Sequence, residues 1–547
     1  MTLVLPAIPD AERTPLVEAL LAVLDAQQQR LRELEQAVAL LRDEVALLKG
    51  QCPKPKIAPS RLEAPPPRPP PAPGDKRPGS AKRSKTASFV KPVEVVIPFP
   101  DPPLGSTPHG HEEYFVQELL LEARAIRYLR QRVLADGRSL LAPLPGDIPP
   151  GSHFGPLLHA YVLYQHHHCN VTQPLILEQL REFGIDISSG QVDRILTHGR
   201  DAFHQEKEQV LRAGLKTASC IGADDTTARH QGKNGYCTAI GNDLFAYFQS
   251  TASKSRLNFL EVLRGPVGGY AVNKAALDYC RLYKLPRALV DRLAAGRAAF
   301  ADEAAWQGHL ASLGMTAARH LLIATEGALL GQVIEHGARP GLVVLSDGAA
   351  QFDILVHASC WIHAERPLAR MVPFNETHRA VIERVREQVW QLYKDLKAYR
   401  HKPDAGKKAG LAERFDRLVG QKTDYCGVKA ALQEMAAHKE DLLRVLDRPE
   451  VPLHNNRMES DIRGYVKTRK ISGSTRSEAG RRCRDTFASL KKTCRKLRVS
   501  FWAYLQDRVR RRGEVARLAD VIGQKASETA APDGQAAPPE AARGAAG

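Results

Sequence analysis

Residues 453–474, LHNNRMESDIRGYVKTRKISGS, are the stretch from which the rest of the chain can be interpreted. The segment has no proline, and the spacing of apolar Met458 and Ile462 predicts a helix. At 3.6 residues per turn, one face of this helix carries Asn455, Glu459, Arg463 and Lys467. Glu459 is therefore either a solvated ion-pair partner or a metal-binding carboxylate that faces a polyanion held by the neighbouring cations.

Two aspartates upstream bear on that choice. Asp224 lies within the strand-like run CIGADDT at 220–226, and Asp347 ends the apolar run GLVVLSDG at 341–348. Carboxylates on two strands and a helix can converge on two divalent cations, which activate a water or a 3′-hydroxyl and stabilise the leaving oxygen of a phosphodiester. Mg²⁺ suits such oxygen ligands. Each aspartate alone could be a strand-end cap, but three such carboxylates in a basic chain favour the catalytic interpretation.

The composition limits the class of protein. The chain has 547 residues, enough for several domains, and its net charge of +17 indicates a polyanionic partner, most simply nucleic acid. A merely soluble basic protein is the alternative, and the clustering of cations beside the motifs argues against it. No run of about 18 apolar residues predicts a membrane span, and the N-terminus does not resemble a signal peptide, so we expect a cytoplasmic protein.

The cysteines do not predict a metal centre. The nine cysteines are scattered and form no CxxC pair, so disulfides and a zinc finger are not expected. Cys169, which follows three histidines at 166–168, could bind a metal, but the sequence supplies no second cluster to complete such a site.

The N-terminal part reads as a coiled coil followed by a linker. Within 11–50, heptad positions a and d are occupied by Val17, Leu24, Leu31, Val38 and Val45, and by Leu20, Gln27, Leu34, Leu41 and Leu48. This pattern favours a parallel dimer through 17–48, and the alternative is an amphipathic helix packed on its own domain. The Pro-rich basic segment 51–110 predicts a disordered linker that either sweeps over DNA or serves as a passive spacer.

Residues 111–215 read as a helical DNA-binding region. Periodicity predicts helices over 111–135 and 155–168, and 174–199 has the pattern helix, Gly184, helix capped by Ser188 or Ser189. This is the pattern of a helix-turn-helix, in which Gln191 and Arg194 would face a DNA groove. Helix pairs of this kind can equally serve only for packing.

The remaining chain alternates strands and helices. Residues 216–265 predict three strands, with turns at 232–235 and 241–243, and then a helix from Arg256 to Arg264. Residues 266–338 read as a helical insertion, 341–348 as a buried strand, 352–356 as a short helix and 359–371 as a strand with its exit. Residues 376–448 and the basic region 476–522 are expected to be helical, and the tail 523–547 disordered.

Three motifs resemble the transposases of the insertion sequence 66 family: ADDTTARH at 223–230, LSDGAAQFDIL at 345–355 with CWIHAER at 360–366, and HNNRMESDIRGYVKTRKISGS at 454–474. The resemblance implies a ribonuclease H-like α/β core over 216–475 with an Asp-Asp-Glu triad, here Asp224, Asp347 and Glu459. The family usually has Asp-Glu-Thr in its first motif, so Asp225 is a rival ligand. The family's cysteine-rich zinc segment is missing, so no zinc is expected.

The resulting prediction is a multidomain DNA transposase of a bacterial insertion sequence. It would bind element ends and target DNA and use two Mg²⁺ ions, with Mn²⁺ as a substitute, for cleavage and strand transfer. Expected partners are terminal inverted repeats, a second copy of the chain and accessory transposition proteins, at the nucleoid. DNA contacts are expected from Gln191, Arg194, Asn455, Asn456, Arg463, Lys467, Arg469 and Lys470.

Two rival functions and two residues stay open at this point. The rivals are an inactive or domesticated DNA-binding protein and a ribonuclease H-like nuclease that only hydrolyses. Trp361 and His363, beside the second motif, could position DNA or water, although core packing is preferred for Trp361.

Overall fold

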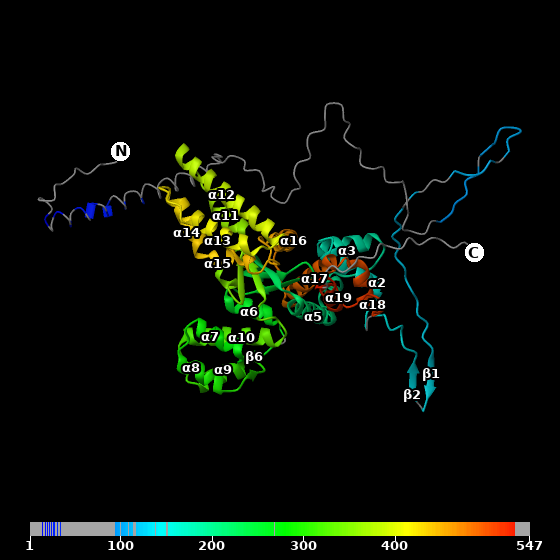
Figure 1. Cartoon of the computed structure of the whole chain (residues 1–547). Coiled ribbons are helices and arrows are strands. Elements are labelled where there is room, and N and C mark those ends of the chain that lie inside the picture. The colour runs from blue at the N-terminus through cyan, green and yellow to red at the C-terminus, as the bar shows by residue number, and fades with distance from the viewer. Residues whose placement is uncertain are drawn as a thin grey trace. The chain divides into compact units, whose positions relative to one another are not determined.

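The computed structural model (Figure 1) describes residues 93–530 except 99, 108, 113–115, 117, 137, 149, 150 and 267, together with scattered positions between 14 and 33. The chain divides into two units, residues 1–127 and 128–547. In the described part, no helix has both the length and the apolar character needed to cross a membrane.

The first unit contains part of the predicted coiled coil. The described positions between 17 and 33 are helical, and the remainder of 11–50 lies outside the described residues, as does the linker up to residue 92. Dimerisation through 17–48 therefore stays a prediction.

The helix expected over 111–135 does not form. The described residues from His111 to Gln131 contain no helix, and β1 (Arg132–Ala135) pairs antiparallel with β2 (Arg138–Leu141). Leu119, Leu120 and Leu129 are 79–84% exposed. An amphipathic helix depends on a surface that covers its apolar face, and these exposed leucines have no such cover, so helical periodicity was an insufficient signal.

The next four helices are α2 (Pro156–His167), α3 (Gln173–Glu182), α4 (Ser189–Thr197) and α5 (Asp201–Thr217). Gly184, with φ +79°, follows α3, and the Ser188 side chain caps α4, as the sequence predicted. The sequence Ser188-x-x-Gln191 forms a capping box, because the Gln191 side chain accepts from the Ser188 backbone N–H. Val192, Ile195 and Leu196 pack into the core.

The central element of the second unit is a five-stranded sheet with the order β5-β4-β3-β8-β9. Its strands are β3 (Cys220–His230), β4 (Lys233–Gly241), β5 (Ala246–Thr251), β8 (Val343–Ser346) and β9 (Val356–Ser359). The first three form an antiparallel meander, and β8 runs parallel to both β3 and β9. The first hairpin turns at Gln231–Gly232, both with positive φ, rather than at the predicted 232–235.

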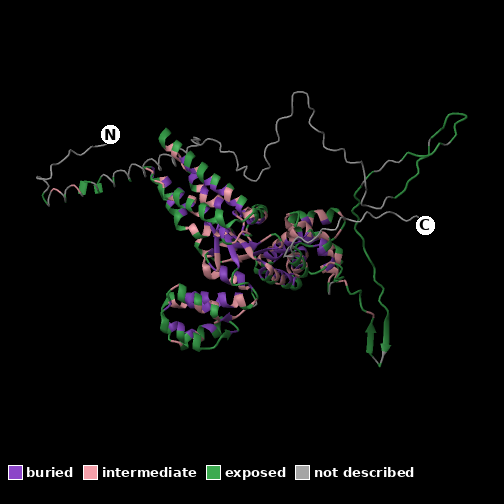
Figure 2. Cartoon of the chain, in the orientation of Figure 1, coloured by how far each residue is buried: buried purple, intermediate pink, exposed green. Residues whose placement is uncertain are grey.

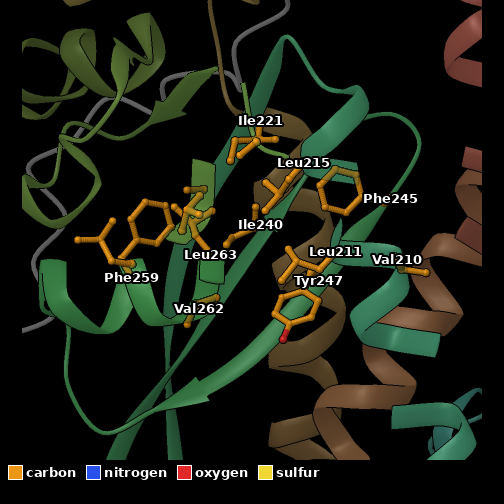
Figure 3. Close-up of a cluster of buried hydrophobic side chains, with 14 of the residues drawn as sticks. Val210, Leu211, Leu215, Ile221, Ile240, Phe245, Tyr247, Phe259, Val262 and Leu263 are labelled. Atoms are coloured by element: carbon orange, nitrogen blue, oxygen red, sulfur yellow. The ribbon is translucent and has the colours of Figure 1, made fainter. Parts of the chain in front are cut away.

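Helices cover both faces of this sheet. On one face, Ile221, Ile240 and Tyr247 pack against α5 and against α6 (Arg256–Arg264), the helix that the sequence predicted with the same bounds (Figure 3). On the other face, Met458 and Ile462 of α16 (Asn456–Ser472) pack on alternate residues of the meander. The helix expected from residues 453–474 is therefore present and lies on the sheet.

The insertion between β5 and β8 is mostly helical, as expected. It contains α7 (Lys274–Leu282), α8 (Arg287–Ala295), α9 (Glu303–Ser312) and α10 (Ala318–Glu335), with the short strands β6 (Tyr270–Ala271) and β7 (Ala299–Phe300). Trp306 is fully buried and stacks on Tyr270. Figure 2 shows buried residues on the inner sides of these helices and exposed residues around them.

Two short predictions after β8 were wrong. Residues 352–356 are not a helix, because the 3₁₀ turn η2 spans Ala350–Phe352 and β9 begins at Val356. Residues 361–370, expected as a strand exit, form helix α11 (Trp361–Arg370), which contains Pro367. Proline usually interrupts a helix interior, and this made the segment look non-helical.

The rest of the chain is helical, as predicted. The elements are α12 (Glu376–His401), α13 (Ala405–Val419), α14 (Cys426–Ala437), α15 (Lys439–Leu442), η3 (Arg444–Leu446), α17 (Glu478–Leu497), α18 (Phe501–Arg510) and α19 (Leu518–Ala530). Helix α19 extends into the segment expected as a disordered tail, and residues 531–547 lie outside the described part.

Candidate active site at the ends of two parallel strands

Asp224 and Asp347 occupy neighbouring positions on adjacent strands. Strands β3 and β8 pair in parallel, with Gly222 opposite Leu345. Two residues further along each strand direction, this register brings Asp224 opposite Asp347, which directly follows β8. Residues in register on parallel strands point to the same face, so the two carboxylates belong to one face of the sheet.

Asp224 lies on the face of the sheet that α16 covers, whereas Asp225 lies on the opposite face. Alternate residues of a strand point to opposite faces, and Ala228, in phase with Asp224, packs against α16. Ala223, in phase with Asp225, packs in the opposite core. Asp225 accepts hydrogen bonds from Thr238 Oγ1 (2.6 Å) and Gln351 Nε2 (3.0 Å). Asp225 is thus satisfied by partners of its own, away from α16.

The start of α16 is joined to β3 by a close contact. A Cβ on Gly222 would lie 2.4 Å from both Asn455 Oδ1 and Met458 Cγ, so only glycine lets the helix approach this closely. Asn455 is 3% exposed, and its Nδ2 donates to the Ala223 carbonyl at 2.8 Å. The Asn455 amide therefore fixes the first turn of α16, and with it Glu459, beside the strand that carries Asp224.

Glu459 lies among cations at the same place. Its Oε1 is 3.5 Å from His363 Nε2 and 3.4 Å from Arg366 Nη2, and its Oε2 is 3.2 Å from Arg463 Nη2. The Glu459 side chain is 19% exposed. The carboxylate is thus an ion-pair partner, as one of the two interpretations has it, and its charge also acts on Asp224.

The other two carboxylates act electrostatically on Asp224. The pKa of Asp224 is raised to about 6, chiefly by burial; the N–H of Asp225 acts against this increase, and the negative charges of Asp347 and Glu459 add to it. A divalent cation would offset this repulsion, and oxygen donors suit Mg²⁺, so charge and donor type fit such an ion. The spacing fits less well: within the described residues, no three His, Cys, Asp or Glu side chains lie close enough to hold a metal ion.

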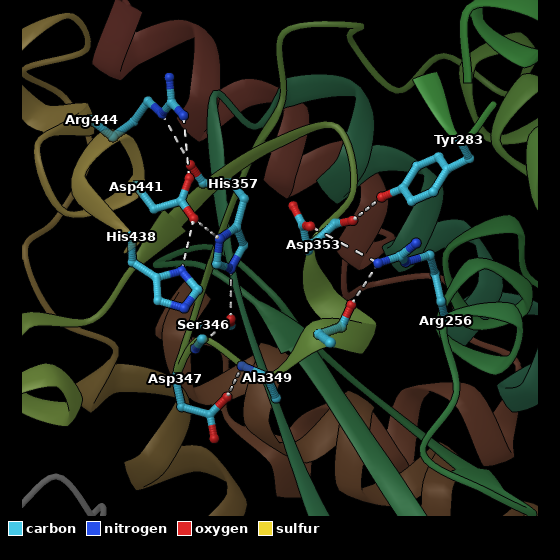
Figure 4. A network of polar contacts seen from close by, with 12 residues as sticks. Arg256, Tyr283, Ser346, Asp347, Ala349, Asp353, His357, His438, Asp441 and Arg444 are labelled. Atoms are coloured by element: carbon cyan, nitrogen blue, oxygen red, sulfur yellow. Dashed lines mark hydrogen bonds and ion pairs between the residues drawn. The ribbon is translucent and has the colours of Figure 1, made fainter. Parts of the chain in front are cut away.

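A buried relay holds the turn that carries Asp347 (Figure 4). Ser346 Oγ accepts from the Gly348 N–H at 3.1 Å and lies 2.9 Å from His357 Nε2. His357 Nδ1 in turn lies 2.9 Å from Asp441 Oδ2. Sequence analysis missed this relay, because Asp441 comes from a distant helix and no local motif points to it.

The residues expected to contact DNA fall into two groups. Arg194, Arg463, Lys467 and Lys470 are exposed. The others have structural partners: Gln191 caps α4, Asn455 bonds to β3, and the Arg469 guanidinium donates to Thr226 Oγ1 and Thr227 Oγ1 of β3. Asn456 is half-buried, with its N–H 3.4 Å from His454 Nδ1.

The other residues singled out from the sequence also have defined positions. Trp361 is 1% exposed and its indole N–H donates to the Leu442 carbonyl, so it packs in the core as preferred. His363 contacts Glu459 and thus belongs to the site. The alternative metal site at 166–169 is not supported: His167 stacks on Phe487 and His168 on Tyr164, and no metal-binding group occurs in the described part.

Two comparisons with known proteins bear on this site. The model of the Transposase IS66 family matches residues 332–482, a range that includes Asp347 and Glu459. The uncharacterized protein y4jO of Sinorhizobium fredii (strain NBRC 101917 / NGR234) is 40% identical over 321 residues, which cover 58% of this chain and all of that protein. The chain belongs to the IS66 family of transposases. This confirms the family, and the matched range contains the second and third of the three motifs, including the helix at 456–472.

Proposed function

We propose that this IS66-family transposase cleaves DNA at element ends and joins the freed 3′-hydroxyl to target DNA, with Asp224, Asp347 and Glu459 as the catalytic carboxylates. The observation that carries the proposal is the register that sets Asp224 and Asp347 side by side on adjacent parallel strands, together with the charge of Glu459 acting on Asp224 from the helix packed on that face. The sheet order, an antiparallel meander followed by two parallel strands, supports a ribonuclease H-like core.

In this proposal, Asp224, Asp347 and Glu459 would hold Mg²⁺ or Mn²⁺. When bound, two such ions supply the charge that activates the attacking oxygen and stabilises the leaving oxygen. The protein's own part is positional: Asn455 and Gly222 fix the helix that carries Glu459, and the Ser346 relay fixes the turn at Asp347. Arg366 and Arg463, which pair with Glu459, carry guanidinium groups that would suit DNA phosphates held beside it.

The relay of Ser346, His357 and Asp441 has the composition of a nucleophilic triad, but its geometry argues against that role. Ser346 is fully buried, and its Oγ already accepts the Gly348 N–H. A substrate carbonyl or phosphate cannot reach such a hydroxyl without unfolding the turn. We therefore assign the relay to support of Asp347.

The exposed cations are proposed to bind DNA. Arg194 on α4 would read the element ends, and Arg463, Lys467 and Lys470 on α16 would hold the phosphates beside the carboxylates. A parallel dimer through 17–48 would present two such sites to two ends.

The test is Mg²⁺-dependent cleavage of a labelled duplex taken from the element end. We expect Glu459→Gln, Asp224→Asn and Asp347→Asn to abolish cleavage and joining, because each change removes a charge that the ions need while preserving side-chain volume. Gel-shift binding should persist in all three variants.

The matched control for this test is Asp225→Asn, the same change on the opposite face of β3, which should keep most of the activity. Wild-type cleavage by Glu459→Gln would reject the triad. If Asp225→Asn alone were inactive, Asp225 rather than Asp224 would be the first metal ligand. Cleavage without joining would favour a hydrolytic nuclease, and binding without cleavage by the wild type would favour an inactive DNA-binding protein.

A further inference from the structure

Helix α4 has one buried face and one face that is open to solvent. Its apolar residues pack into the core, and the helix lies against both α2 and α3. On the opposite side, Gly190, Asp193 and Arg194 are exposed, and at 3.6 residues per turn they share one face. All three lie in the first two turns of α4, the part of a recognition helix that contacts base edges in a helix-turn-helix.

Asp193 is the residue on this face that phosphate binding does not explain. Its carboxylate has no hydrogen-bond or ion-pair partner among the described residues, although Arg194 is its neighbour in sequence. A carboxylate repels DNA phosphates and therefore weakens contact with the DNA backbone. At a base edge in the major groove, however, a carboxylate can accept a hydrogen bond from the N4 amino group of cytosine.

Gly190 is a second feature of this face that the fold does not explain. Its φ lies outside the left-handed region, and a Cβ at this position would meet no described atom within 4 Å. Glycine is also a poor helix former, so neither the backbone nor the packing of α4 requires it. A missing side chain lets a helix backbone approach a ligand closely. The glycine, one turn before Arg194, therefore favours close contact between this face and a partner.

We propose that Asp193 is a specificity-determining residue, which accepts a hydrogen bond from a cytosine N4 amino group in the major groove while Arg194 donates to a guanine. The proposal rests on the proposed function, because it takes α4 as the helix that contacts DNA. In the major groove, guanine presents the acceptors O6 and N7, and cytosine presents a donor. A carboxylate and a guanidinium on one helix face are thus complementary to G·C pairs.

The test is a selection of duplexes from a randomised library by the full-length protein in EDTA. The wild type should enrich a motif that contains G·C pairs. Asp193→Ala should lose the preference for cytosine at one position of that motif. Asp193→Asn should shift the preference there towards adenine, because an amide can both donate to N7 and accept from N6 of that base. A purely structural role of Asp193 would not change the base preferred at a single position.

Anisotropy titrations measure the size of the effect. The wild type should bind the selected duplex about fivefold to tenfold more tightly than one in which that C·G pair is T·A, because thymine has an acceptor where cytosine has its donor. For Asp193→Ala the ratio should fall to about one. Asp186→Asn, the same change as Asp193→Asn at an exposed carboxylate in the turn between α3 and α4, should keep the wild-type motif. Melting curves identify any variant that is unfolded.

Gly190→Leu tests the close approach of α4 to the groove. The space around a Cβ at this position is open, so the melting temperature should not fall, whereas affinity for the selected duplex should fall severalfold. Gly308→Leu makes the same change at an exposed glycine of α9 that also has open space around it, and should bind the selected duplex as the wild type does. Wild-type affinity of Gly190→Leu would contradict a base contact from this face.

The outcomes separate this proposal from the one on which it rests. DNA binding without an enriched motif, or a motif that Asp193→Ala leaves unchanged, overturns the base contact and leaves DNA binding intact. Asp193 would then be a solvated surface carboxylate. Failure to bind any duplex rejects the DNA-binding function itself, and the base contact with it. Because the selection is made without divalent cations, these results do not depend on the proposed catalytic carboxylates.

Discussion

At the scale of single residues, Asp224 carries an electrostatic cost that its proposed role explains. Its pKa of about 6 lies above the usual 3.8, because burial and the charges of Asp347 and Glu459 disfavour the ionised form. The folded state therefore binds the proton more tightly than the unfolded state does. The contribution of Asp224 to stability therefore falls as pH rises from about 4 to about 6 and stays lower above that range.

Asp224→Asn should consequently stabilise the metal-free protein. At pH 7.5 in EDTA we expect a gain of about 1–3 kcal/mol in the free energy of unfolding, which shrinks towards pH 4 as the wild-type carboxyl becomes protonated. Added Mg²⁺ should raise the melting temperature of the wild type more than that of the variant. Thermal melts across pH, with and without Mg²⁺, measure both effects. An unchanged or lower melting temperature in EDTA would contradict the repulsion among the carboxylates.

Some single residues of the site could be predicted from the sequence and others could not. Asp347 was predictable because a short apolar run ends at it, and Glu459 because helical spacing sets it among cations. Asn455 was expected to touch DNA, but a polar residue at the start of a helix can equally bond to a neighbouring strand, and local sequence does not distinguish the two. Asp441 gave no signal, since its role depends on a contact between distant segments.

At the scale of elements, the insertion is coupled to the turn that follows Asp347. Arg256, at the start of α6, donates to the Ala350 carbonyl of η2 at 3.1 Å (Figure 4). Its guanidinium also lies 4.6 Å from the ring centroid of Tyr283, the residue that directly follows α7. Gln351 of the same turn bonds to Asp225 in β3. The insertion is thus linked through Arg256 to the turn that follows Asp347 and that also contacts Asp225.

Arg256→Met should uncouple the insertion from this turn. We expect cleavage to slow by about threefold to thirtyfold, because the turn loses a charge-assisted hydrogen bond, with no change in DNA affinity. Arg256→Lys should recover only part of the rate, because an ammonium does not reproduce the planar stacking on Tyr283. Single-turnover cleavage and gel shifts measure the two quantities separately. Arg287→Met, at a 95% exposed side chain of α8, is the matched control.

If the coupling affects catalysis, Arg256→Met must slow cleavage. Equal single-turnover rates for Arg256→Met and the wild type would therefore mean that the insertion does not influence the cleavage step. A loss of DNA affinity in place of rate would instead make Arg256 part of a binding surface.

Element types were predictable where a periodic pattern had a surface to pack on. Helices α6 and α16 follow their patterns because the sheet covers their apolar faces. Strand β8 follows its pattern because its apolar residues are buried within the sheet and its cores. The segment 111–135 has helical periodicity too, but its described leucines are exposed. No packing surface therefore stabilises a helix there. Helix α11 was not predicted, because it contains Pro367 and proline is unusual inside a helix.

At the scale of the whole molecule, the C-terminal helices complete the sheet rather than forming a separate basic region. Asp485, Ser489 and Thr493, spaced four residues apart on α17, accept hydrogen bonds from the backbone N–H groups of β5. The helix thereby covers an edge strand that would otherwise offer unpaired groups to another chain. A sequence reading that ends the core at 475 misses this, because the link joins residues more than 230 positions apart.

The net charge of +17 has a measurable consequence for DNA binding. Each phosphate neutralised by Lys or Arg releases counterions, and the logarithm of affinity falls with the logarithm of salt concentration by about 0.9 per contact. Lys467 and Lys470 are exposed on α16, beyond Glu459 along the same helix. Lys467→Gln together with Lys470→Gln should therefore reduce the slope by about 2 and weaken binding equally on element-end and random duplexes.

Anisotropy titrations between 50 and 300 mM salt measure this slope. Over that range the Debye length falls to a little less than half of its starting value. Lys284→Gln with Lys407→Gln makes the same charge change at exposed positions of the insertion and α13, and should leave the slope near the wild-type value. Because charge alone would make the two double variants equivalent, a difference between them assigns the DNA path to α16. An equal loss of slope in both double variants would mean that DNA binding depends on the net charge of the molecule. It would contradict the proposal that α16 contacts the DNA phosphates.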